Sequence, residues 1–553
     1  MPQFRRLVLV GATLLAACGH APPPTTAPVP TPAVAPAAPA PTVAVTPAAV
    51  APALPPFPRA SGALSLDMVY PPENHTLSVR DSTFVFGSVG HGDATLVING
   101  APVRVNPNGS FMAYLPVPSD TVYTMHAALP TGETAVAVRR LRYPPRNAAP
   151  RPAAVLDTVG YPRLVTLANT NEYAASDTDR VTIARPTPGG TYQWFLLPGT
   201  EVIATGRLGG STRIRLDSQI EAWVENAGIV TATGSGAAGA APDTTPSPAP
   251  PATVTPRIQR LTAARVAAAA GYTDIVLSLS ARTPVAVEQS GTGMTLTVYG
   301  ARANLDIIRF DTNDPTVRLV RHEQVSNDRV RFDVDLRHPP VGYLVLWRNS
   351  ALVLRVRHLP PIHAASPLRG RVIAVDPGHP PGGSMGPTRL WEPEATLAIG
   401  EALKTMLEAR GARVLMLRTS MDAVALGARP IQARRENAEA FVSIHLNAFA
   451  DGANPFAAAR GTGTFFFHPQ SEPLARFVQQ GMVRHLGLRD EGIFFNNLAV
   501  VRATWFPSVL CEGAWTVMPE QEAALRTPEF QRAYARGVVD GLEQYFRSLA
   551  MPR

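Results

Sequence analysis

The sequence predicts a multidomain protein in which N-terminal all-β modules precede a C-terminal α/β domain with a mainly parallel sheet flanked by helices. Its length of 553 residues exceeds the size at which a single hydrophobic core stops growing. Before residue 360, short apolar runs alternate with polar residues at every second position, as in half-buried strands. After residue 370, apolar runs alternate with segments of helical periodicity, which favours parallel strands covered on both faces.

The first residues carry the pattern of a secretory signal. Arg5 and Arg6 precede an apolar stretch, Leu7 to Ala17, that is too short to span a bilayer. Leu-Ala-Ala before Cys18 resembles the lipobox of bacterial lipoproteins, which implies cleavage after residue 17 and lipidation of Cys18. We therefore expect a periplasmic, lipid-anchored protein, attached to the outer membrane because no aspartate follows Cys18. The alternative is an ordinary signal peptide that is cut nearby.

Changes of composition divide the rest of the chain. Residues 20–60 are almost entirely Ala, Pro, Val and Thr, a composition that forms a semi-rigid spacer rather than a core. Asn99-Gly100 between two apolar runs is a hairpin signal and favours an immunoglobulin-like sandwich. The predicted boundaries are 1–17 signal peptide, 18–61 linker, 62–145 immunoglobulin-like sandwich, 153–233 β-rich and SH3-like module, 234–256 linker, 257–360 β-sandwich and 370–550 α/β domain.

The charge pattern excludes one class of partner. The formal net charge is +8, but Lys404 is the only lysine, and the arginines are scattered rather than clustered with aromatic residues. We therefore expect no nucleic-acid binding. Cys511 is the only cysteine besides Cys18, and its place in an apolar run predicts a small buried core residue rather than a reactive thiol.

The α/β domain is built from elements that the apolar periodicity separates. The last helix carries one apolar stripe that includes Phe530, Tyr534 and Val538. Strands are predicted at 371–375, 414–417, 440–444, 464–467 and 509–511, and helices at 393–410, 429–438, 472–485 and 528–549.

Polar residues follow three of the predicted strands. His379 in Val-Asp-Pro-Gly-His, His445 in Ser-Ile-His-Leu-Asn-Ala and Glu512 in Pro-Ser-Val-Leu-Cys-Glu-Gly each end an apolar run. In an open α/β sheet such ends lie on one rim, where sites are built. Alone, either histidine is more simply a turn or core residue, and Glu512 could pair with an arginine. Together, two imidazoles and a carboxylate form the ligand set of a catalytic zinc, and a further carboxylate can move a proton.

Two glutamates compete for the remaining ligand position. Glu392 precedes Pro393, and proline favours the first turn of a helix, so Glu392 lies at the helix start. Glu394 is the competitor, although a carboxylate in the first turn also stabilises a helix by its charge alone.

Residues 371–549 resemble the catalytic domain of zinc-dependent N-acetylmuramoyl-L-alanine amidases. The resemblance rests on the three quoted segments and on the order of the elements. It implies that one zinc ion is bound by His379, Glu392 and His445 and that Glu512 is the catalytic glutamate. The family's first glutamate lies five residues before a helix leucine, and Glu392 lies five before Leu397, which selects it over Glu394.

The resemblance also implies a substrate, the amide bond between N-acetylmuramic acid and the L-alanine of the peptidoglycan stem peptide, cut for wall remodelling or daughter-cell separation. Residues 257–360 resemble the β-sandwich modules that precede such domains and bind peptidoglycan or localise the enzyme. Peptidoglycan is therefore the expected partner, with the membrane held through Cys18; a protein activator is left open. The alternatives are a catalytically silent wall-binding lipoprotein and a zinc peptidase that cuts the stem peptide.

The sequence departs from the family at the loop after the first histidine. Pro380-Pro381 stands where the family has Gly-Gly, Glu392-Pro393 stands for Glu-Lys, and the loop from His379 to Glu392 is short. These changes affect the shape of the loop and its substrate contacts, whereas every ligand is present. Only Phe449 to Thr462 separates the second histidine segment from the next strand, so we expect no autoinhibitory helix there.

Overall fold

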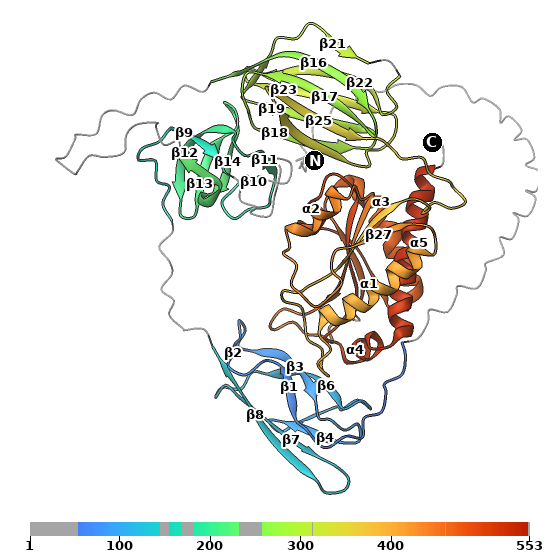
Figure 1. Ribbon diagram of the computed structural model, residues 1–553. Helices are drawn as coiled ribbons and strands as arrows, with labels where there is room; N and C mark the ends of the chain where they lie inside the picture. The colour runs from blue at the N-terminus through green and yellow to red at the C-terminus, as the bar shows by residue number, and fades with distance from the viewer. Residues whose placement is uncertain are drawn as a thin grey trace, which may run out of the picture. The chain divides into compact units, whose positions relative to one another are not determined.

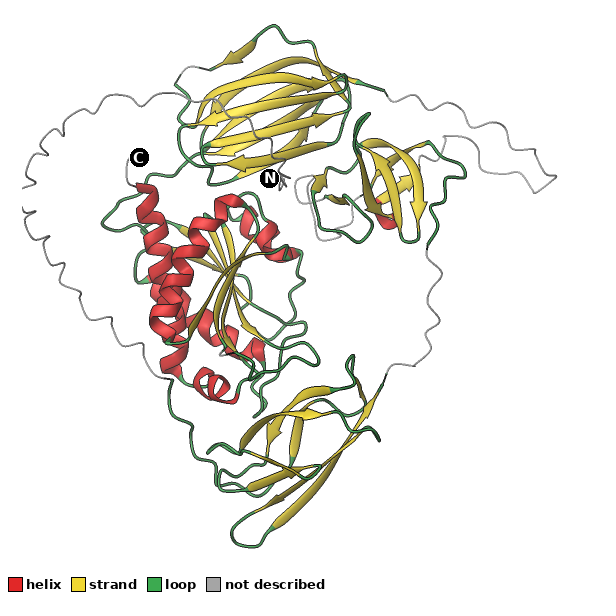
Figure 2. Ribbon diagram, turned by 180° about the vertical axis from the view of Figure 1, so that it is seen from behind, coloured by secondary structure: helices red, strands yellow, loops and turns green. Residues whose placement is uncertain are grey.

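The computed structural model describes residues 54–143, 154–168, 181–231 and 257–550, apart from positions 312 and 459 (Figure 1). The predicted signal peptide, Cys18 and the linker 234–256 lie outside these residues, as does most of the linker 18–61. The described chain is β-rich up to residue 360, and its five α-helices all belong to the C-terminal domain (Figure 2). Among the described residues, none of the helices is both long and apolar enough to cross a membrane.

Residues 67–142 form two sheets that enclose one apolar core. The sheets have the strand orders β1-β3-β6 and β2-β8-β7-β4-β5. The predicted turn Asn99-Gly100 joins β4 to β5, and both residues have positive φ, 46° and 83°, as the two-residue hairpin turn requires. The strands are β1 Asp67–Tyr70, β2 His75–Thr76, β3 Ser82–Ser88, β4 Thr95–Ile98, β5 Ala101–Val103, β6 Ser110–Pro116, β7 Val122–Ala128 and β8 Thr134–Arg142.

The next described segments form one sheet of seven strands in the order β11-β10-β14-β13-β12-β9-β15. All its neighbouring strands are antiparallel. The strands are β9 Arg163–Leu167, β10 Thr182–Arg185, β11 Trp194–Leu196, β12 Glu201–Leu208, β13 Ser211–Arg215, β14 Glu221–Glu225 and β15 Ile229–Thr231.

Residues 259–357 again form two sheets around a mainly aliphatic core that includes Phe332 and Tyr343. One sheet has the order β20-β16-β17-β25-β24, with β21 beside β16, and the other β18-β19-β23-β22. The strands are β16 Gln259–Ala269, β17 Tyr272–Leu279, β18 Val285–Ser290, β19 Gly293–Tyr299, β20 Ala301–Ala303, β21 Ile308–Phe310, β22 Val317–Ser326, β23 Arg329–Leu336, β24 Tyr343–Arg348 and β25 Ala351–Arg357.

The C-terminal domain is a six-stranded sheet in the order β27-β26-β28-β31-β29-β30. The first four strands in this order are mutually parallel; β29 is antiparallel to β31, and β30 is parallel to β29. The elements are β26 Val372–Pro377, α1 Glu392–Glu408, β27 Arg413–Met416, α2 Ala428–Arg435, β28 Ala440–Asn447, β29 Gly461–Phe466, α3 Glu472–Leu486, β30 Arg489–Phe495, β31 Ser508–Trp515, α4 Pro519–Leu525 and α5 Pro528–Ala550.

The central strands of this sheet are buried on both faces. Alternate residues such as Ile373 and Val375 pack with apolar residues of α1, α3 and α5. The intervening Ala374, with Phe441, packs on the other face against α2 and the segment around Val501. Strands covered on both faces need near-continuous apolar sequence, which explains the short apolar runs between residues 371 and 515.

In the C-terminal domain the structure contains one strand and one α-helix that the sequence did not predict. It also places two candidate site residues inside strands rather than at strand ends. Strand β30 and helix α4 were not anticipated, because β30 is half polar and α4 is short. His445 and Glu512 were expected at strand ends, but β28 continues to Asn447 and β31 to Trp515. His445 and Glu512 therefore lie within paired strands rather than after them. The two residues are also register partners of each other.

Candidate metal centre

His379 lies two residues after β26 in a backbone conformation that few residues adopt. Its φ is +57°, which for a non-glycine residue persists only where the surroundings enforce it. Its ring Nδ1 is 2.9 Å from the carbonyl oxygen of Pro381, so a proton on Nδ1 makes that bond and Nε2 remains free as a ligand. The loop that departs from the family at Pro380-Pro381 therefore orients the His379 ring.

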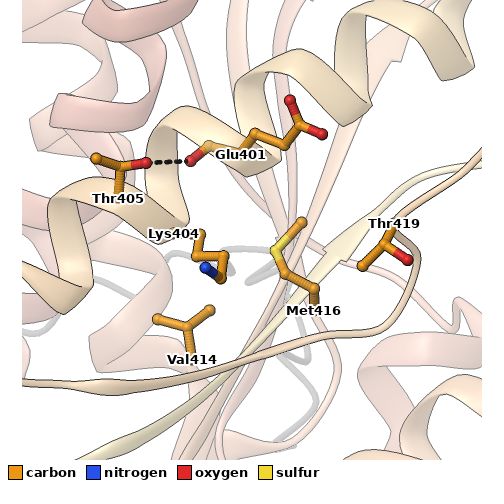
Figure 3. A pocket seen from close by; sticks show the side chains of 6 residues that line it. All are labelled: Glu401, Lys404, Thr405, Val414, Met416 and Thr419. Atoms are coloured by element: carbon orange, nitrogen blue, oxygen red, sulfur yellow. Dashed lines mark hydrogen bonds between the residues drawn. The ribbon is translucent and has the colours of Figure 1, made fainter.

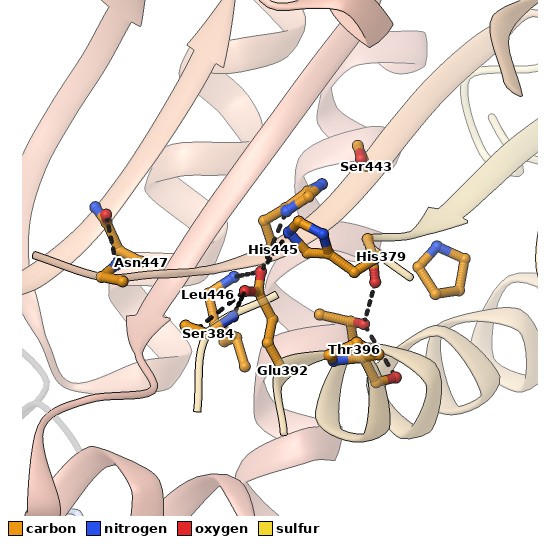
Figure 4. A network of polar contacts seen from close by, with 12 residues as sticks. His379, Ser384, Glu392, Thr396, Ser443, His445, Leu446 and Asn447 are labelled. Carbon is orange, nitrogen blue, oxygen red and sulfur yellow. Dashed lines mark hydrogen bonds and ion pairs between the residues drawn. The ribbon is translucent and has the colours of Figure 1, made fainter. Parts of the chain in front are cut away.

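Glu392 is the first residue of α1, and its carboxylate is the best-connected group of the site (Figure 4). Oε2 accepts hydrogen bonds from the Ser384 N–H and hydroxyl, at 2.9 and 3.0 Å, and Oε1 accepts one from the Leu446 N–H at 3.1 Å. Oε1 also lies 3.2 Å from His445 Nδ1 and 3.5 Å from His379 Nε2. One carboxylate oxygen thus faces two ring nitrogens.

Electrostatics separates Glu392 from an ordinary buried carboxyl group. Burial opposes its ionisation, but the hydrogen bond from His445, the charges of both histidines and the Ser384 N–H outweigh burial, and the pKa of Glu392 is lowered. Burial alone would lower the pKa of His445, whereas its carboxylate neighbours Glu392 and Glu512 raise it. The cluster therefore favours an ionised Glu392 at neutral pH.

The two histidine rings meet because the chain leaves room for them. Their centroids are 4.9 Å apart and their planes are nearly perpendicular, at 78°. Gly378 has no side chain to intervene, since a Cβ there would lie only 2.5 Å from the His445 ring. One ligand atom from each of His379, Glu392 and His445 lies within 4.8 Å of the others.

Glu512 has the opposite environment to Glu392. Its Oε2 is buried and has no hydrogen-bond partner among the described residues. Burial raises the pKa of Glu512, the charge of His445 opposes this rise and the charge of Glu392 adds to it, so that the pKa is about 8. The neighbouring Cys511 is fully buried, and burial raises its pKa well above the ordinary value; these properties confirm the predicted core residue.

The candidates named from the sequence thus separate into two groups. The structure brings together His379, Glu392 and His445 and places Glu512 on the strand beside His445. Glu394 is exposed on α1 and takes no part in the cluster. Cys18, the predicted lipidation site, lies outside the described residues.

Arg429 was missed by sequence reasoning and holds the loop behind His379. It is 3% exposed, and its Nη1 pairs with the buried Asp376 at 2.7 Å. The other Asp376 oxygen accepts the Ser443 hydroxyl at 2.7 Å. The guanidinium also donates to the carbonyls of Pro377 and Pro380, at 3.1 and 2.9 Å.

Arg418 connects that loop to the start of α1. It donates to the carbonyl oxygens of Pro377 at 3.1 Å, Gly378 at 3.2 Å and Pro393 at 2.8 Å. Burial and the charge of Arg429 lower its pKa to about 10, so it stays charged at neutral pH. No sequence signal separates these two arginines from the many others, because their carbonyl partners are invisible in a sequence.

A concave surface lies away from this cluster, between the later turns of α1 and strand β27 (Figure 3). Its volume is about 380 Å³, and it is lined by Glu401, Lys404, Thr405, Val414, Met416 and Thr419. It contains none of the metal-ligand candidates.

Comparisons with known proteins find relatives of this chain. Residues 373–544 match the family described as N-acetylmuramoyl-L-alanine amidase. A Staphylococcus epidermidis protein named probable cell wall amidase LytH is 32% identical over 213 residues, 37% of this chain and 68% of that protein. The N-acetylmuramoyl-L-alanine amidase AmiC of Neisseria meningitidis serogroup B is 26% identical over 395 residues, 54% of this chain and 93% of that protein. A solved N-acetylmuramoyl-L-alanine amidase structure from Clostridium difficile 630 shares 30% identity, with 32% of this chain and 97% of that chain covered and a TM-score of 0.30.

Proposed function

The chain belongs to the N-acetylmuramoyl-L-alanine amidase family, and we propose that it uses one zinc ion to hydrolyse the amide between N-acetylmuramic acid and L-alanine in peptidoglycan. The observation that carries the proposal is a contrast at the site. The Glu392 carboxylate lies between two ring nitrogens and accepts several hydrogen bonds, whereas Oε2 of Glu512, on the adjacent strand, has no hydrogen-bond partner among the residues the structure describes. The first arrangement suits a cation and the second suits proton transfer.

The donor set fits zinc. Two imidazole nitrogens and a carboxylate oxygen are the protein ligands of known catalytic zinc sites, which keep a further position open. His379 and Glu392 already have outer hydrogen-bond partners, Pro381 and Ser384, of the kind that orient zinc ligands. When bound, zinc supplies Lewis-acid polarisation of a carbonyl oxygen and makes water more acidic.

Glu512 would then move the proton. Its carboxylate takes a proton from the water that attacks the lactyl carbonyl carbon, and it delivers that proton to the departing nitrogen of L-alanine. A pKa of about 8 in the protein alone would be lowered by a cation held at the three ligands, since an opposite charge favours the carboxylate. Since no described residue donates a hydrogen bond to Oε2, that oxygen is available to the reacting groups.

We further propose that lipidated Cys18 tethers the domain to a membrane surface, with the outer membrane facing the periplasm as the site of attachment. The signal pattern before Cys18 and the Pro/Ala-rich spacer after it support this proposal. Fractionation of cell membranes would test it. The wild-type protein should be released from the membrane by detergent but not by salt, whereas Cys18→Ser should not be attached to the membrane at all.

The activity test uses purified peptidoglycan. Wild-type protein and Glu512→Gln are incubated with sacculi, and the products are analysed by mass spectrometry and by amino-terminal labelling. We expect a new amino-terminal alanine with the wild type and almost none with Glu512→Gln. Release of D-alanine would instead indicate a stem-peptide peptidase, and binding without turnover by the wild type would indicate a silent wall-binding protein.

A further inference from the structure

The sequence pattern assigned Tyr534 to the apolar stripe of α5, but its hydroxyl group has a polar task. The side chain is fully buried. The hydroxyl accepts a hydrogen bond from the Gly513 N–H at 3.0 Å and lies within donating distance of two carbonyl oxygens, Cys511 at 2.9 Å and His445 at 3.2 Å. Two of these backbone groups, those of Cys511 and Gly513, flank Glu512 on β31, and the third belongs to His445 on β28.

The strand pairing is irregular at this point. His445 and Glu512 are register partners, but the register of β28 and β31 shifts immediately afterwards, before Asn447 pairs with Trp515. An irregular ladder loses some of its own hydrogen bonds and leaves backbone groups in need of partners. The Tyr534 hydroxyl contacts both strands there and supplies partners that the ladder does not.

Glu512 depends on its backbone for orientation more than the metal-ligand candidates do. Glu392 is fixed by hydrogen bonds from Ser384 and Leu446, whereas Oε2 of Glu512 has no hydrogen-bond partner within the described ranges. A carboxylate without its own hydrogen bonds is positioned by the chain that carries it. The groups on both sides of Glu512 meet at the Tyr534 hydroxyl.

The fit between Tyr534 and the strand is also steric. A Cβ on Gly513 would lie 2.3 Å from the Tyr534 ring, so the residue after Glu512 must be glycine while the ring occupies this place. Core filling alone would need only the phenylalanine ring. The hydroxyl is buried at a cost unless it is bonded, and here it is bonded to the two strands of the site.

We propose that Tyr534 is a positioning residue that fixes Glu512 relative to His445 through its hydroxyl group. The inference rests on the proposed role of Glu512 in proton transfer. Tyr534 itself touches neither the ligand atoms of the metal cluster nor the reacting groups, so its effect should appear in the rate of the chemical step rather than in zinc content or substrate binding.

The test compares Tyr534→Phe with the matched control Tyr545→Phe, which alters another buried tyrosine of α5. Full-length, zinc-loaded proteins are assayed on a soluble N-acetylmuramoyl peptide, well below their unfolding temperatures, and zinc content is measured on the same samples. For Tyr534→Phe we expect kcat to fall about ten- to hundredfold, the scale of a small misplacement of a reacting group. KM should change less than about twofold and zinc content not at all, and Tyr545→Phe should keep the wild-type kcat.

An unchanged kcat in Tyr534→Phe, with only a lower unfolding temperature, would overturn the proposal and leave a structural role. The same assay on Glu512→Gln separates the two proposals. If Glu512→Gln is fully active, the role of Glu512 fails; if it is inactive while Tyr534→Phe is fully active, only the positioning fails. Should Tyr534→Phe not fold, amide hydrogen exchange of the wild type decides: the Gly513 amide should exchange only with global unfolding, and rapid exchange would contradict the inference.

Discussion

The two buried glutamates of the site show how one fold gives the same side chain opposite properties. Glu392 begins a helix and receives hydrogen bonds from Ser384 and Leu446 beside two imidazoles, and its pKa is lowered. Glu512 lies inside a strand, its Oε2 has no hydrogen-bond partner in the part of the chain that the structure describes, and burial raises its pKa to about 8. A ligand must hold its charge and its place, whereas a proton carrier must gain and lose a proton near neutral pH.

The largest expected effect comes from removing Glu512, the proposed proton carrier. Glu512→Gln should lower kcat about 10²- to 10⁴-fold, the usual contribution of general acid–base catalysis, because an amide cannot take the water proton. Zinc content should stay at the wild-type level, since Glu512 lies outside the ligand cluster. Turnover of peptidoglycan and zinc content measured on the same sample check both halves. Loss of zinc from this variant would erase the distinction between the two glutamates.

The converse substitution should act through the metal. Glu392→Gln should reduce zinc affinity by about a hundredfold or more, beyond the roughly 10- to 100-fold cost of losing an outer partner, because a neutral amide replaces a charged ligand. Competition with a chromophoric chelator measures the affinity, and added zinc should restore part of the activity. Glu394→Gln, which alters an exposed carboxylate two residues later, should match the wild type; an equal loss there would contradict the ligand assignment.

The two glutamates should also give stability of the zinc-free protein opposite dependences on pH. Between the ordinary glutamate pKa of 4.5 and about 8, the folded state holds a proton on Glu512 that the unfolded state releases. The free energy of unfolding should therefore fall as pH rises through this interval, by on the order of 5 kcal/mol at about 1.4 kcal/mol per pKa unit. The lowered pKa of Glu392 has the reverse sign, and its contribution is lost as pH falls below about 4.5.

Urea unfolding of chelator-treated protein at a series of pH values measures this difference. Glu512→Gln should flatten the decline between pH 5 and 8 (approximate limits from the linkage argument), while Glu392→Gln should leave the decline and weaken the acid-side loss. Identical profiles for the wild type and Glu512→Gln would show that burial does not raise the pKa of Glu512.

The smallest effect is expected from the arginine behind the loop. Arg429→Lys keeps a positive charge near Asp376 but cannot reach the carbonyl groups of Pro377 and Pro380 together. Zinc affinity should fall about tenfold, as for other outer partners, because the His379 loop loses its support. Arg435→Lys, on the exposed side of the same helix, is the control, and chelator competition is again the measurement. Unaltered affinity in Arg429→Lys would mean that His379 is held without the arginine.

The candidate metal ligands could be predicted from the sequence, whereas the groups that orient them could not. His379 and His445 follow or interrupt apolar runs, so their residue type and position predicted a site at the rim where the strands end. Backbone N–H groups of Leu446 and Ser384 donate hydrogen bonds that orient Glu392, and they lie 54 and 8 residues from it in the sequence. Every residue except proline has such a donor, so residue type does not reveal which donors are used. The polar contacts of Tyr534 were not predicted for another reason. A tyrosine within an apolar stripe is indistinguishable by pattern from a large side chain that only fills the core.

The fold shows the same division. The parallel strands β26, β28 and β31 were found because burial on both faces demands apolar runs. Strand β30 escaped because Arg489, Asp490 and Glu491 fill its first half, and a strand at the sheet edge does not need an apolar sequence. His445 and Glu512 lie inside their strands rather than at the ends, because β28 continues to Asn447 and β31 to Trp515. The apolar runs could not show this, because each run is interrupted by the charged or polar residue itself.

The groove beside α1 gives this chain a single chemical handle. Lys404, the only lysine in the sequence, projects beside that groove with its ammonium group 3.1 Å from Glu408, and it is about 18 Å along the helix from Glu392 at 1.5 Å per residue. An amine-reactive dye or support therefore has one side-chain target. Molecules coupled there would all be attached through the same turn of α1. The metal cluster lies towards the other end of the helix and would stay accessible to a large polymer that cannot reorient at a surface.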